Sequence, residues 1–307
     1  MKTLYRALVL VIFSLSICFS SLFGMSKGPI TVASKIDTEG ALLGQMIIAL
    51  LKKNGFETVD KTEFGPTPLV RKAIINGQID IYPEYTGNGG FFFSMAGSDL
   101  WKNAEKGYQK VKELDLEKNN IVWLKPAPAN NTWAVAIRKD LSKAEKIFTF
   151  EDFAAYVNRG GDVKIAGSEE FVNRVDALPA FQKAYGFKLR KDQLLVLSGG
   201  NTAQTEKAAA NKTSGVNTAM AYGTDGALAA LGLHVLTDTK GVQPVYEPAP
   251  IVRKSVFEKY PEIETILAPA FKSLTLETLQ SLNAKIAMGG IDAKKVAVDY
   301  LTSKGFL

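Results

Sequence analysis

The sequence predicts an α/β fold in which two domains are joined by two crossovers of the chain. Short β-branched segments alternate with helical segments, which is typical of α/β domains with largely parallel sheets. The length of 307 residues is enough for two such domains. Two proline-containing segments, residues 126–131 and 245–252, interrupt the alternation. They predict that the chain leaves the first domain and later returns to it.

The first domain is predicted to begin with a strand followed by a helix. Residues 30–34 form an apolar, β-branched strand, and residues 41–53 carry apolar side chains at helical spacing up to Gly55. Thr67 is the predicted cap of the next helix, with Pro68 in its first turn. The remaining elements expected before the first crossover are the end of this helix at Gly77, a strand over 79–82, a helix over 101–114 and a strand over 121–124.

A second domain of the same kind is predicted beyond the first crossover. Its expected elements are strands over 132–138, 163–166 and 220–222 and a helix that starts near Thr149 and Asp152; after the second crossover, three helices start at about Ser255, Thr275 and Asp292. We therefore expect residues 27–128 and 252–307 to form lobe I and residues 129–251 to form lobe II. A ligand site is expected between the lobes, where strands end and helices begin.

The amino terminus is predicted to be a secretory signal. Lys2 and Arg6 precede an uncharged apolar run over residues 7–23. This run is short for a membrane span, and no later stretch of the sequence approaches eighteen uninterrupted apolar residues. We expect residues 1–26 to be cleaved and the mature protein to be periplasmic; cleavage near Ser20 is the alternative.

The single cysteine and the single histidine exclude several kinds of chemistry. Cys18 follows Ile17 rather than the small residue of a lipid-attachment box, so lipid anchoring is not expected. Cleavage removes Cys18 and leaves no thiol and no disulfide. His234 lies in an apolar, strand-like segment, where a packed or edge histidine is expected. We therefore expect no zinc site. Composition leaves a metal site made of carboxylates alone open, but no Asp-x-Asp-x-Asp type loop occurs, so no other metal site and no cofactor are expected.

The charge of the chain gives no support to nucleic-acid binding. The formal net charge is +6, and loss of Lys2 and Arg6 with the signal lowers it by two. The lysines are scattered singly or in pairs, without the aromatic interleaving of a nucleic-acid surface. We expect solvated surface lysines and no nucleic-acid partner.

Residues 81–90, Ile-Tyr-Pro-Glu-Tyr-Thr-Gly-Asn-Gly-Gly, are the most informative segment of the chain. A short apolar strand runs directly into a loop that carries Tyr82, Glu84 and Tyr85. A core has no need for these residue types, so the loop is expected to meet a ligand. Tyr82 and Glu84 are expected to shape the loop, Glu84 by accepting backbone hydrogen bonds.

Six segments of the mature chain, in order, resemble the osmoprotectant-binding proteins of ABC importers, which take glycine betaine, choline, proline betaine or carnitine. They are Ser34-Lys35 with Glu39, residues 80–87, 131–134, 170–176, 222–225 and 246–252. The Tyr-Pro-Glu-Tyr-Thr-Gly element is highly specific, and the others are individually weak. The resemblance implies the type II periplasmic binding protein fold, with the ligand cleft between two lobes, and a monomer that delivers its ligand to permease and ATPase subunits during osmotic stress.

The resemblance also implies an aromatic cage for the ligand. A trimethylammonium group is cationic but has no N–H to donate, so the negative faces of aromatic rings bind it where hydrogen-bond acceptors cannot. The matching rings are Tyr85, Trp133, Tyr222 and Tyr246. Without the resemblance, half-buried packing is the simpler interpretation of Tyr222 and Tyr246, and packing stays an equal alternative for Trp133.

A polar subsite is implied for the carboxylate of a betaine. The matching positions are Lys35, Asn88 and Arg174, with Arg174 as the main anchor because a guanidinium can engage both carboxylate oxygens. Asn131 stands where the family can carry an aspartate near the ammonium group. The alternative for Arg174 is an ion pair with Glu170 or Asp176.

Two other functions are alternatives to this interpretation. The same fold could bind an amino acid or another small anion through Arg174 and Lys35 without a cation cage. An exported hydrolase is the alternative from another class, but the sequence has no Gly-x-Ser-x-Gly elbow, and its one histidine lies in an apolar run. We therefore expect a binding protein rather than an enzyme.

Overall fold

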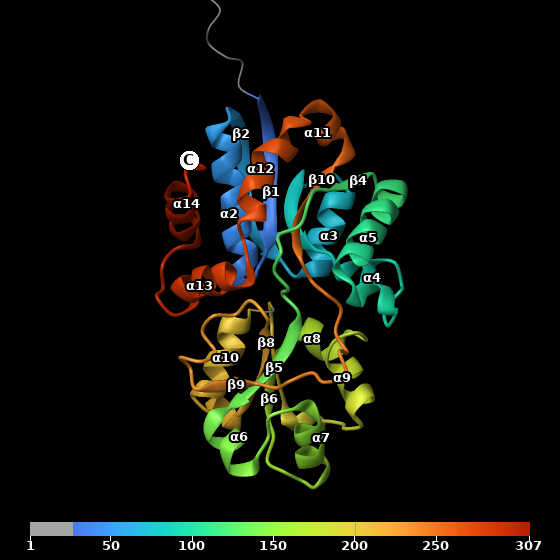
Figure 1. Cartoon of the computed structure of the whole chain (residues 1–307), viewed down its shortest axis with the longest axis vertical. Helices are drawn as coiled ribbons and strands as arrows, with labels where there is room; N and C mark the ends of the chain where they lie inside the picture. The colour runs from blue at the N-terminus through green and yellow to red at the C-terminus, as the bar shows by residue number, and fades with distance from the viewer. Residues whose placement is uncertain (1–26, 200) are drawn as a thin grey trace, which may run out of the picture.

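The protein folds into two α/β lobes arranged end to end (Figure 1). The computed structural model describes residues 27–199 and 201–307. The predicted signal segment, including Cys18, lies outside the described residues. Lobe I contains the beginning and the end of the described chain, and lobe II contains its middle (Figure 1).

The sheet of lobe I has the strand order β2-β1-β3-β10-β4. Its strands are β1 (Lys27–Lys35), β2 (Phe56–Gly65), β3 (Ile81–Tyr85), β4 (Ile121–Trp123) and β10 (Pro248–Arg253). The strands β2, β1 and β3 are parallel, whereas β10 runs antiparallel to both β3 and β4. Because β10 pairs with β3, the chain has returned to this sheet by Pro248, earlier than the boundary expected at residue 251.

The sheet of lobe II repeats this arrangement in the order β7-β6-β8-β5-β9. Its strands are β5 (Trp133–Arg138), β6 (Ile165–Ser168), β7 (Leu194–Leu197), β8 (Thr218–Tyr222) and β9 (Leu233–Val235). Here β7, β6 and β8 are parallel, and β5 is antiparallel to β8 and β9. Each sheet is therefore mixed rather than largely parallel, because the strand that follows a crossover enters its sheet in the opposite direction.

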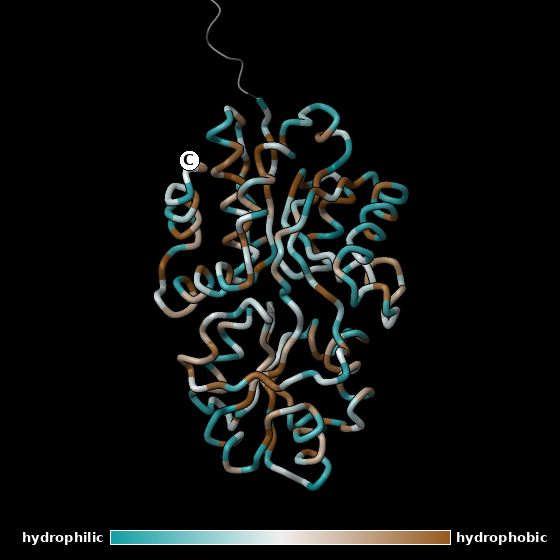
Figure 2. The backbone as a smooth tube through the Cα atoms, in the orientation of Figure 1, coloured by the Kyte–Doolittle hydropathy of each residue, from teal (hydrophilic) through white to brown (hydrophobic). Residues whose placement is uncertain are grey.

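Helices cover both faces of each sheet (Figure 1). Lobe I carries α2 (Thr38–Lys53), α3 (Thr67–Ile75), α4 (Asn88–Phe92), α5 (Ala104–Asn119), α11 (Lys254–Lys259), α12 (Glu262–Lys272), α13 (Leu276–Ala287) and α14 (Ala293–Ser303); lobe II carries α6 (Lys139–Glu145), α7 (Phe150–Asn158), α8 (Glu169–Asn173), α9 (Leu178–Tyr185) and α10 (Thr202–Ala210). Short 3-10 turns are η1 (Asp99–Lys102), η2 (Lys191–Gln193) and η3 (Thr213–Gly215). The hydrophobic residues gather in the strands and in the helix faces turned toward them (Figure 2).

Several helix starts follow from their capping residues. Thr149 and Asp152 form the capping box of α7, and Thr275 and Asp292 cap α13 and α14, which confirms those three predicted starts. The helix expected from residue 41 begins earlier, at Thr38, because the Asp37 carboxylate accepts a hydrogen bond from the Gly40 amide. The predicted cap at Thr67 was wrong, since Pro66 is the capping residue of α3 and no side chain caps this helix.

The two crossover segments lie against each other between the lobes. The Asn131 amide donates a hydrogen bond to the Tyr246 carbonyl at 2.9 Å, and the Thr132 hydroxyl donates one to the Pro244 carbonyl at 3.1 Å. Figure 1 shows both segments running side by side from one lobe to the other. These two segments, residues 126–131 and 245–252, connect the lobes and are called the hinge below.

Candidate ligand-binding site

A cavity lies between the lobes at the level of the crossovers. It is lined by residues of both lobes: Lys35, Ile36, Asp37, Pro66, Thr67, Tyr85, Asn88, Asn131, Trp133, Ser168, Glu170, Arg174, Gly199, Tyr222 and Tyr246. The space open to the centres of water molecules is about 30 Å³. This is more than the roughly 10–15 Å³ that one water needs, so the site is a cavity and not part of the packed core. The structure brings together all eight site residues that the sequence predicted.

The four predicted rings reach the cavity from four different segments. Tyr85 ends β3, Trp133 begins β5, Tyr222 ends β8 and Tyr246 lies on the second crossover. Trp133 and Tyr222 are directly paired residues of the antiparallel strands β5 and β8, which places their ring centroids 4.8 Å apart with an angle of 42° between the rings. The Phe171 ring also lies 5.3 Å from the Trp133 ring, so Trp133 packs against the core of lobe II and also lines the cavity.

The loop after β3 is held to the second crossover. The Thr86 hydroxyl donates to the Val245 carbonyl at 3.1 Å and accepts from the Glu247 amide at 3.1 Å. The next residue, Gly87, lies so close that a Cβ atom there would be 2.8 Å from the Val245 carbonyl oxygen and 2.9 Å from the Tyr246 ring. A glycine at position 87 therefore lets the loop after β3 approach the second crossover closely. This contact fixes the position of Tyr246 relative to Tyr85.

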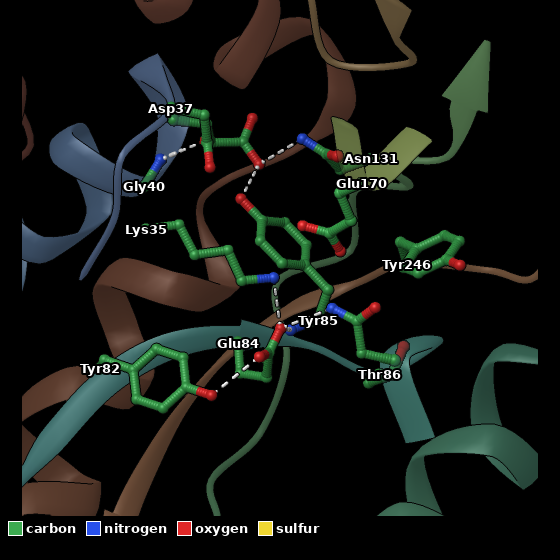
Figure 3. Close-up of polar contacts among 12 residues, drawn as sticks. Lys35, Asp37, Gly40, Tyr82, Glu84, Tyr85, Thr86, Asn131, Glu170 and Tyr246 are labelled. Carbon is green, nitrogen blue, oxygen red and sulfur yellow. Dashed lines mark hydrogen bonds and ion pairs between the residues drawn. The ribbon is translucent and has the colours of Figure 1, made fainter. Parts of the chain in front are cut away.

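The carboxylate of Glu84 organises the polar side of the cavity (Figure 3). It accepts hydrogen bonds from the Tyr82 hydroxyl at 2.8 Å, the Tyr85 amide at 2.7 Å and the Asn88 side chain at 2.8 Å, and it pairs with the Lys35 ammonium at 2.6 Å. Burial raises the pKa of the Glu84 carboxyl, but Lys35 and these donors outweigh burial and hold the pKa below its usual value. The backbone hydrogen bond expected of Glu84 is confirmed. The placement of Tyr82, Glu84 and Tyr85 in a loop was wrong, because all three lie in the buried strand β3 and the loop begins after Tyr85.

All five N–H groups of Arg174 are engaged within the protein. The guanidinium donates twice to Asp176, at 2.7 Å each, and once each to Glu170 at 2.7 Å, Asn88 at 2.8 Å and the Tyr246 hydroxyl at 3.2 Å. Five donors thus meet five acceptor contacts. The ion pairs that the sequence left as an alternative are present, and the bond to Asn88 joins the two lobes.

A second buried carboxylate, Glu39, sits behind Tyr85 at the junction of the lobes. It accepts from the Tyr85 hydroxyl at 3.0 Å, from the Asn131 side chain at 2.9 Å and from the Asn283 side chain at 2.7 Å. Burial is the main reason that the pKa of Glu39 is raised to about 7. Glu39 belonged to the family resemblance, but no role was predicted for it.

Asp37 also lines the cavity, and no role was predicted for it. The Asp37 carboxylate caps α2 by accepting a hydrogen bond from the Gly40 amide at 2.8 Å. Asp37 is only 9% exposed. This side chain lines the same cavity as Lys35 and Glu170. The signal in the sequence was the N-cap position itself, Asp37 followed by Thr38 and Glu39, which a helix start placed at residue 41 passes over.

No helix among the described residues is long and apolar enough to cross a membrane. Within residues 27–199 and 201–307, no group of three or more His, Cys, Asp and Glu side chains is placed to hold a metal ion. His234 lies on the edge strand β9, partly exposed and 5.5 Å from the Phe148 ring, as expected of an edge histidine.

Known proteins resemble the chain over nearly its whole length. Residues 28–303 match the family model described as the substrate binding domain of the ABC-type glycine betaine transport system. The glycine betaine-binding protein YehZ of Escherichia coli (strain K12) is 59% identical over 281 residues, 92% of each chain. A glycine-betaine-binding protein of Pseudomonas aeruginosa (strain PAO1) is 31% identical over 276 residues, 88% of this chain and 86% of its own.

Solved structures agree with this assignment. The structure of apo YehZ from Escherichia coli, 58% identical, superposes with a TM-score of 0.66 over 91% of this chain and 100% of its own. A glycine betaine/carnitine/choline ABC transporter protein with 20% identity shares the fold, with a TM-score of 0.69 over 90% of this chain and 99% of its own.

The matched family consists of the binding domains of importers. This match argues against the alternative function of an exported hydrolase, and it places the protein outside the cytoplasm. The chain belongs to the family of substrate-binding domains of ABC-type glycine betaine transport systems.

Proposed function

We propose that this protein captures a small quaternary ammonium compound in the aromatic cage of Tyr85, Trp133, Tyr222 and Tyr246 and delivers it to the permease and ATPase subunits of an ABC importer. The observation that carries the proposal is that these four rings, drawn from both lobes and the hinge, line one cavity. Glycine betaine is the first candidate, because relatives at 59% and 31% identity are named for it. Choline is the second candidate, because it carries the same trimethylammonium group.

The chemistry of the rings supports this class of ligand. Burial raises the pKa of Tyr85, Tyr222 and Tyr246 above the usual value, so these rings stay neutral and keep their hydroxyl protons. A ring that faces a desolvated cation contributes on the order of 0.5 to 2 kcal/mol. Three or four rings therefore supply a large part of a micromolar affinity before the costs of association are subtracted.

The position of the site between the lobes supports capture by closure. A ligand that contacts Tyr85 on lobe I and Trp133 and Tyr222 on lobe II is bound fully only when the lobes approach. Closure of the two lobes about a hinge is a common response of such binding proteins to their ligand.

The proposal also includes export to the periplasm through an N-terminal signal of residues 1–26. The protein is expected to act as a monomer without a cofactor.

Calorimetric titration with choline, glycine betaine and proline tests the proposal. The cage predicts that at least one of the two quaternary compounds binds ten or more times tighter than proline, because proline has no trimethylammonium group. Proline binding as tightly as both quaternary compounds would instead support the alternative in which the same fold holds an amino acid through Arg174 and Lys35.

A further inference from the structure

We propose that Glu206, which lies outside the cavity, is a positioning residue of the ligand site. Glu206 keeps its proton in the folded protein and donates it in a hydrogen bond to Asp225, and the two carboxyl groups together hold the turn that presents Tyr222 to the cavity. The inference rests on the proposed function and names a residue on which that function depends. It follows from the contacts of helix α10 and of the turn after β8.

The side chain of Asp225 closes the turn over residues 222–225. Its Oδ2 atom accepts a hydrogen bond from the Tyr222 amide at 2.6 Å, and the Asp225 amide donates to the Tyr222 carbonyl at 3.1 Å. Its Oδ1 atom accepts a hydrogen bond from the Thr202 hydroxyl at 3.0 Å. Asp225 therefore ties the residue that carries the ring to the first residue of α10.

Glu206 faces the same carboxylate from one helical turn further along α10. Residues four apart on a helix lie on one face, so Glu206 and Thr202 both reach Asp225. The carboxyl groups of Glu206 and Asp225 are within hydrogen-bond reach of each other. Glu206 is 1% exposed, and its Oε1 atom accepts no hydrogen bond from any of the described residues. Two carboxyl groups can share a hydrogen bond only when one of them is protonated.

No cation among the described residues neutralises this pair of carboxyl groups. Neither Glu206 nor Asp225 forms an ion pair within that part of the chain. Helix α10 packs against β5, β6, β8, β9 and η3, and the only side chains on these elements that can be cationic are those of Arg138 on β5 and His234 on β9. Arg138 is paired with Asp140 at 2.7 Å, and His234 is partly exposed.

The surrounding charges indicate which of the two groups holds the proton. Burial and then the neighbouring charge of Asp225 raise the pKa of Glu206 far above its usual value, and Lys207, which is exposed, lowers it less. Burial and the charge of Asp37 also raise the pKa of Asp225, but the hydrogen bonds that Asp225 accepts lower it. Lys139 lines the groove beside Asp225 and is exposed. Glu206 is therefore the group that stays protonated.

The turn held by this pair connects the cavity to the contact between the lobes. Tyr222 lines the cavity at one end of the turn. The Thr224 hydroxyl, two residues later, accepts a hydrogen bond at 2.6 Å from Asn131, which lines the cavity, and the Thr224 carbonyl accepts one at 3.1 Å from Asn283 of lobe I. A displacement of the turn therefore moves the ring and disturbs both contacts.

The variants Glu206→Gln and Glu206→Met separate the proton of Glu206 from the size of its side chain. Both remove the carboxyl group, but glutamine keeps an N–H that can donate to the Asp225 carboxylate, whereas methionine has a similar length and no donor. Glu117→Gln and Glu117→Met are the matched controls, because Glu117 is exposed on α5 of the other lobe. Thermal unfolding of all four variants shows whether the fold is kept.

Infrared spectroscopy tests the proton without any ligand. At about pH 8.5, above the pKa of about 7 of Glu39, the wild type is expected to show the carbonyl stretch of a protonated carboxyl group. The difference between the spectra of the wild type and Glu206→Gln should contain this band, and the difference between the wild type and Glu117→Gln should not.

Calorimetric titration with glycine betaine and with choline tests the positioning of Tyr222. Glu206→Gln is expected to bind within threefold of the wild type. Glu206→Met should bind about tenfold more weakly, because loss of a hydrogen bond to a charged group leaves Tyr222 in its binding position only part of the time. Both Glu117 variants should stay within twofold.

Three results overturn the proposal. The first is the absence of the band from the difference between the wild type and Glu206→Gln, which counts even if Glu206→Met fails to fold. The second is wild-type affinity in a folded Glu206→Met, and the third is an equal loss of affinity in both Glu206 variants. If the wild type binds neither glycine betaine nor choline, the proposed function itself fails, and the role of Glu206 in binding fails with it.

Discussion

At the scale of single residues, the site combines four rings that we propose bind a cation with polar groups that already satisfy one another. Tyr222 is the ring of the proposed cage that is least committed to a core, since it is only partly buried and packs at 4.8 Å against Trp133. Tyr246, in contrast, is 3% exposed and accepts a hydrogen bond from Arg174. Tyr222 is therefore the better residue for testing the role of a ring in binding.

Removal of the Tyr222 ring is expected to weaken choline binding. Tyr222→Ala should lower the affinity tenfold or more, about 1.4 kcal/mol, whereas Tyr222→Phe keeps a ring face and should stay within threefold. Titration calorimetry measures both variants. Equal affinities for Tyr222→Ala and the wild type would show that this ring packs against Trp133 without contacting the ligand.

The buried carboxylate of Glu39 predicts a particular dependence of stability on pH. Its pKa is raised to about 7 in the folded protein, above the ordinary glutamate value of about 4.3 in the unfolded chain. Between these values the folded state binds a proton that the unfolded state has lost, so the stability that Glu39 contributes is highest below the lower value and falls as pH rises to about 7. The loss is on the order of 3 kcal/mol.

Glu39→Gln should flatten this dependence. Chemical unfolding at a series of pH values from 4.5 to 7.5 measures it, with Glu117→Gln on the exposed face of α5 as the control. The slope of the free energy of unfolding against pH should become less negative in Glu39→Gln and stay at the wild-type value in Glu117→Gln. The same slope in all three proteins would show that Glu39 does not titrate in this range.

The site residues that could be predicted from the sequence lie in specific motifs. The features of the site that were not predicted depend on tertiary contacts. Tyr85 and Asn88 belong to one continuous signature that ends a strand. The saturation of Arg174 could not be predicted, because its partner Asn88 is 86 residues away on the other lobe. The place of Asp37 in the cavity also depends on tertiary structure, because the other lining residues come from distant segments of both lobes.

At the scale of elements, two strands that were not predicted from the sequence, β2 and β7, are edge strands, whereas β10, which was expected only as part of a crossover, is a central strand. β2 and β7 form one edge of their sheets and β9 forms the opposite edge of the second sheet. The mainly exposed β2 lacks the apolar run that identified other strands. The apolar β7 is only four residues long, too short for periodicity to distinguish a strand from a helical segment. The other central strands and the long capped helices were predictable because local sequence and burial agree there.

The contact between the loop after β3 and the second crossover gives a prediction at this scale. Gly87→Ala would place a Cβ atom 2.8 Å from the Val245 carbonyl oxygen and 2.9 Å from the Tyr246 ring. The crossover must then shift, which should cost about 1–3 kcal/mol of stability and weaken choline binding. Gly107→Ala in α5 is the control, because its Cβ would meet the nearest atom at an ordinary 3.5 Å.

Chemical unfolding and titration calorimetry measure the two glycine variants. Gly87→Ala should lose stability and affinity together, whereas Gly107→Ala should keep both or gain stability from the better helix former. A Gly87→Ala protein with wild-type stability and affinity would mean that the crossover is free to move without disturbing Tyr246.

At the scale of the whole molecule, the hinge and a contact on one flank determine how the lobes meet. The loop after β8 lies against α13 of lobe I: the Gln280 side chain donates to the Gly223 carbonyl at 2.9 Å, and the Asn283 side chain donates to the Thr224 carbonyl at 3.1 Å. A Cβ atom at Gly226 would lie 1.9 Å from the Gln280 carbonyl oxygen. The lobes can reach this arrangement only with a glycine at that position.

Gly226→Ala is therefore expected to hold the lobes apart. Small-angle X-ray scattering with saturating choline should show a larger radius of gyration than for the wild type, and the choline affinity should fall tenfold or more because the cage is incomplete when the lobes are open. Gly107→Ala again serves as the control. The same radius and affinity in Gly226→Ala as in the wild type would remove this contact from the account of closure.

The central claim, that aromatic rings hold a quaternary ammonium cation, is tested most directly by replacing the charged nitrogen of the ligand with carbon. Choline and 3,3-dimethylbutan-1-ol have nearly the same shape and the same hydroxyl group, but only choline carries a charge. In calorimetric titrations of the wild-type protein, the account predicts that choline binds at least tenfold tighter than its neutral counterpart. Equal affinities would show that the cavity binds by shape and apolar contact alone, and would contradict the cage.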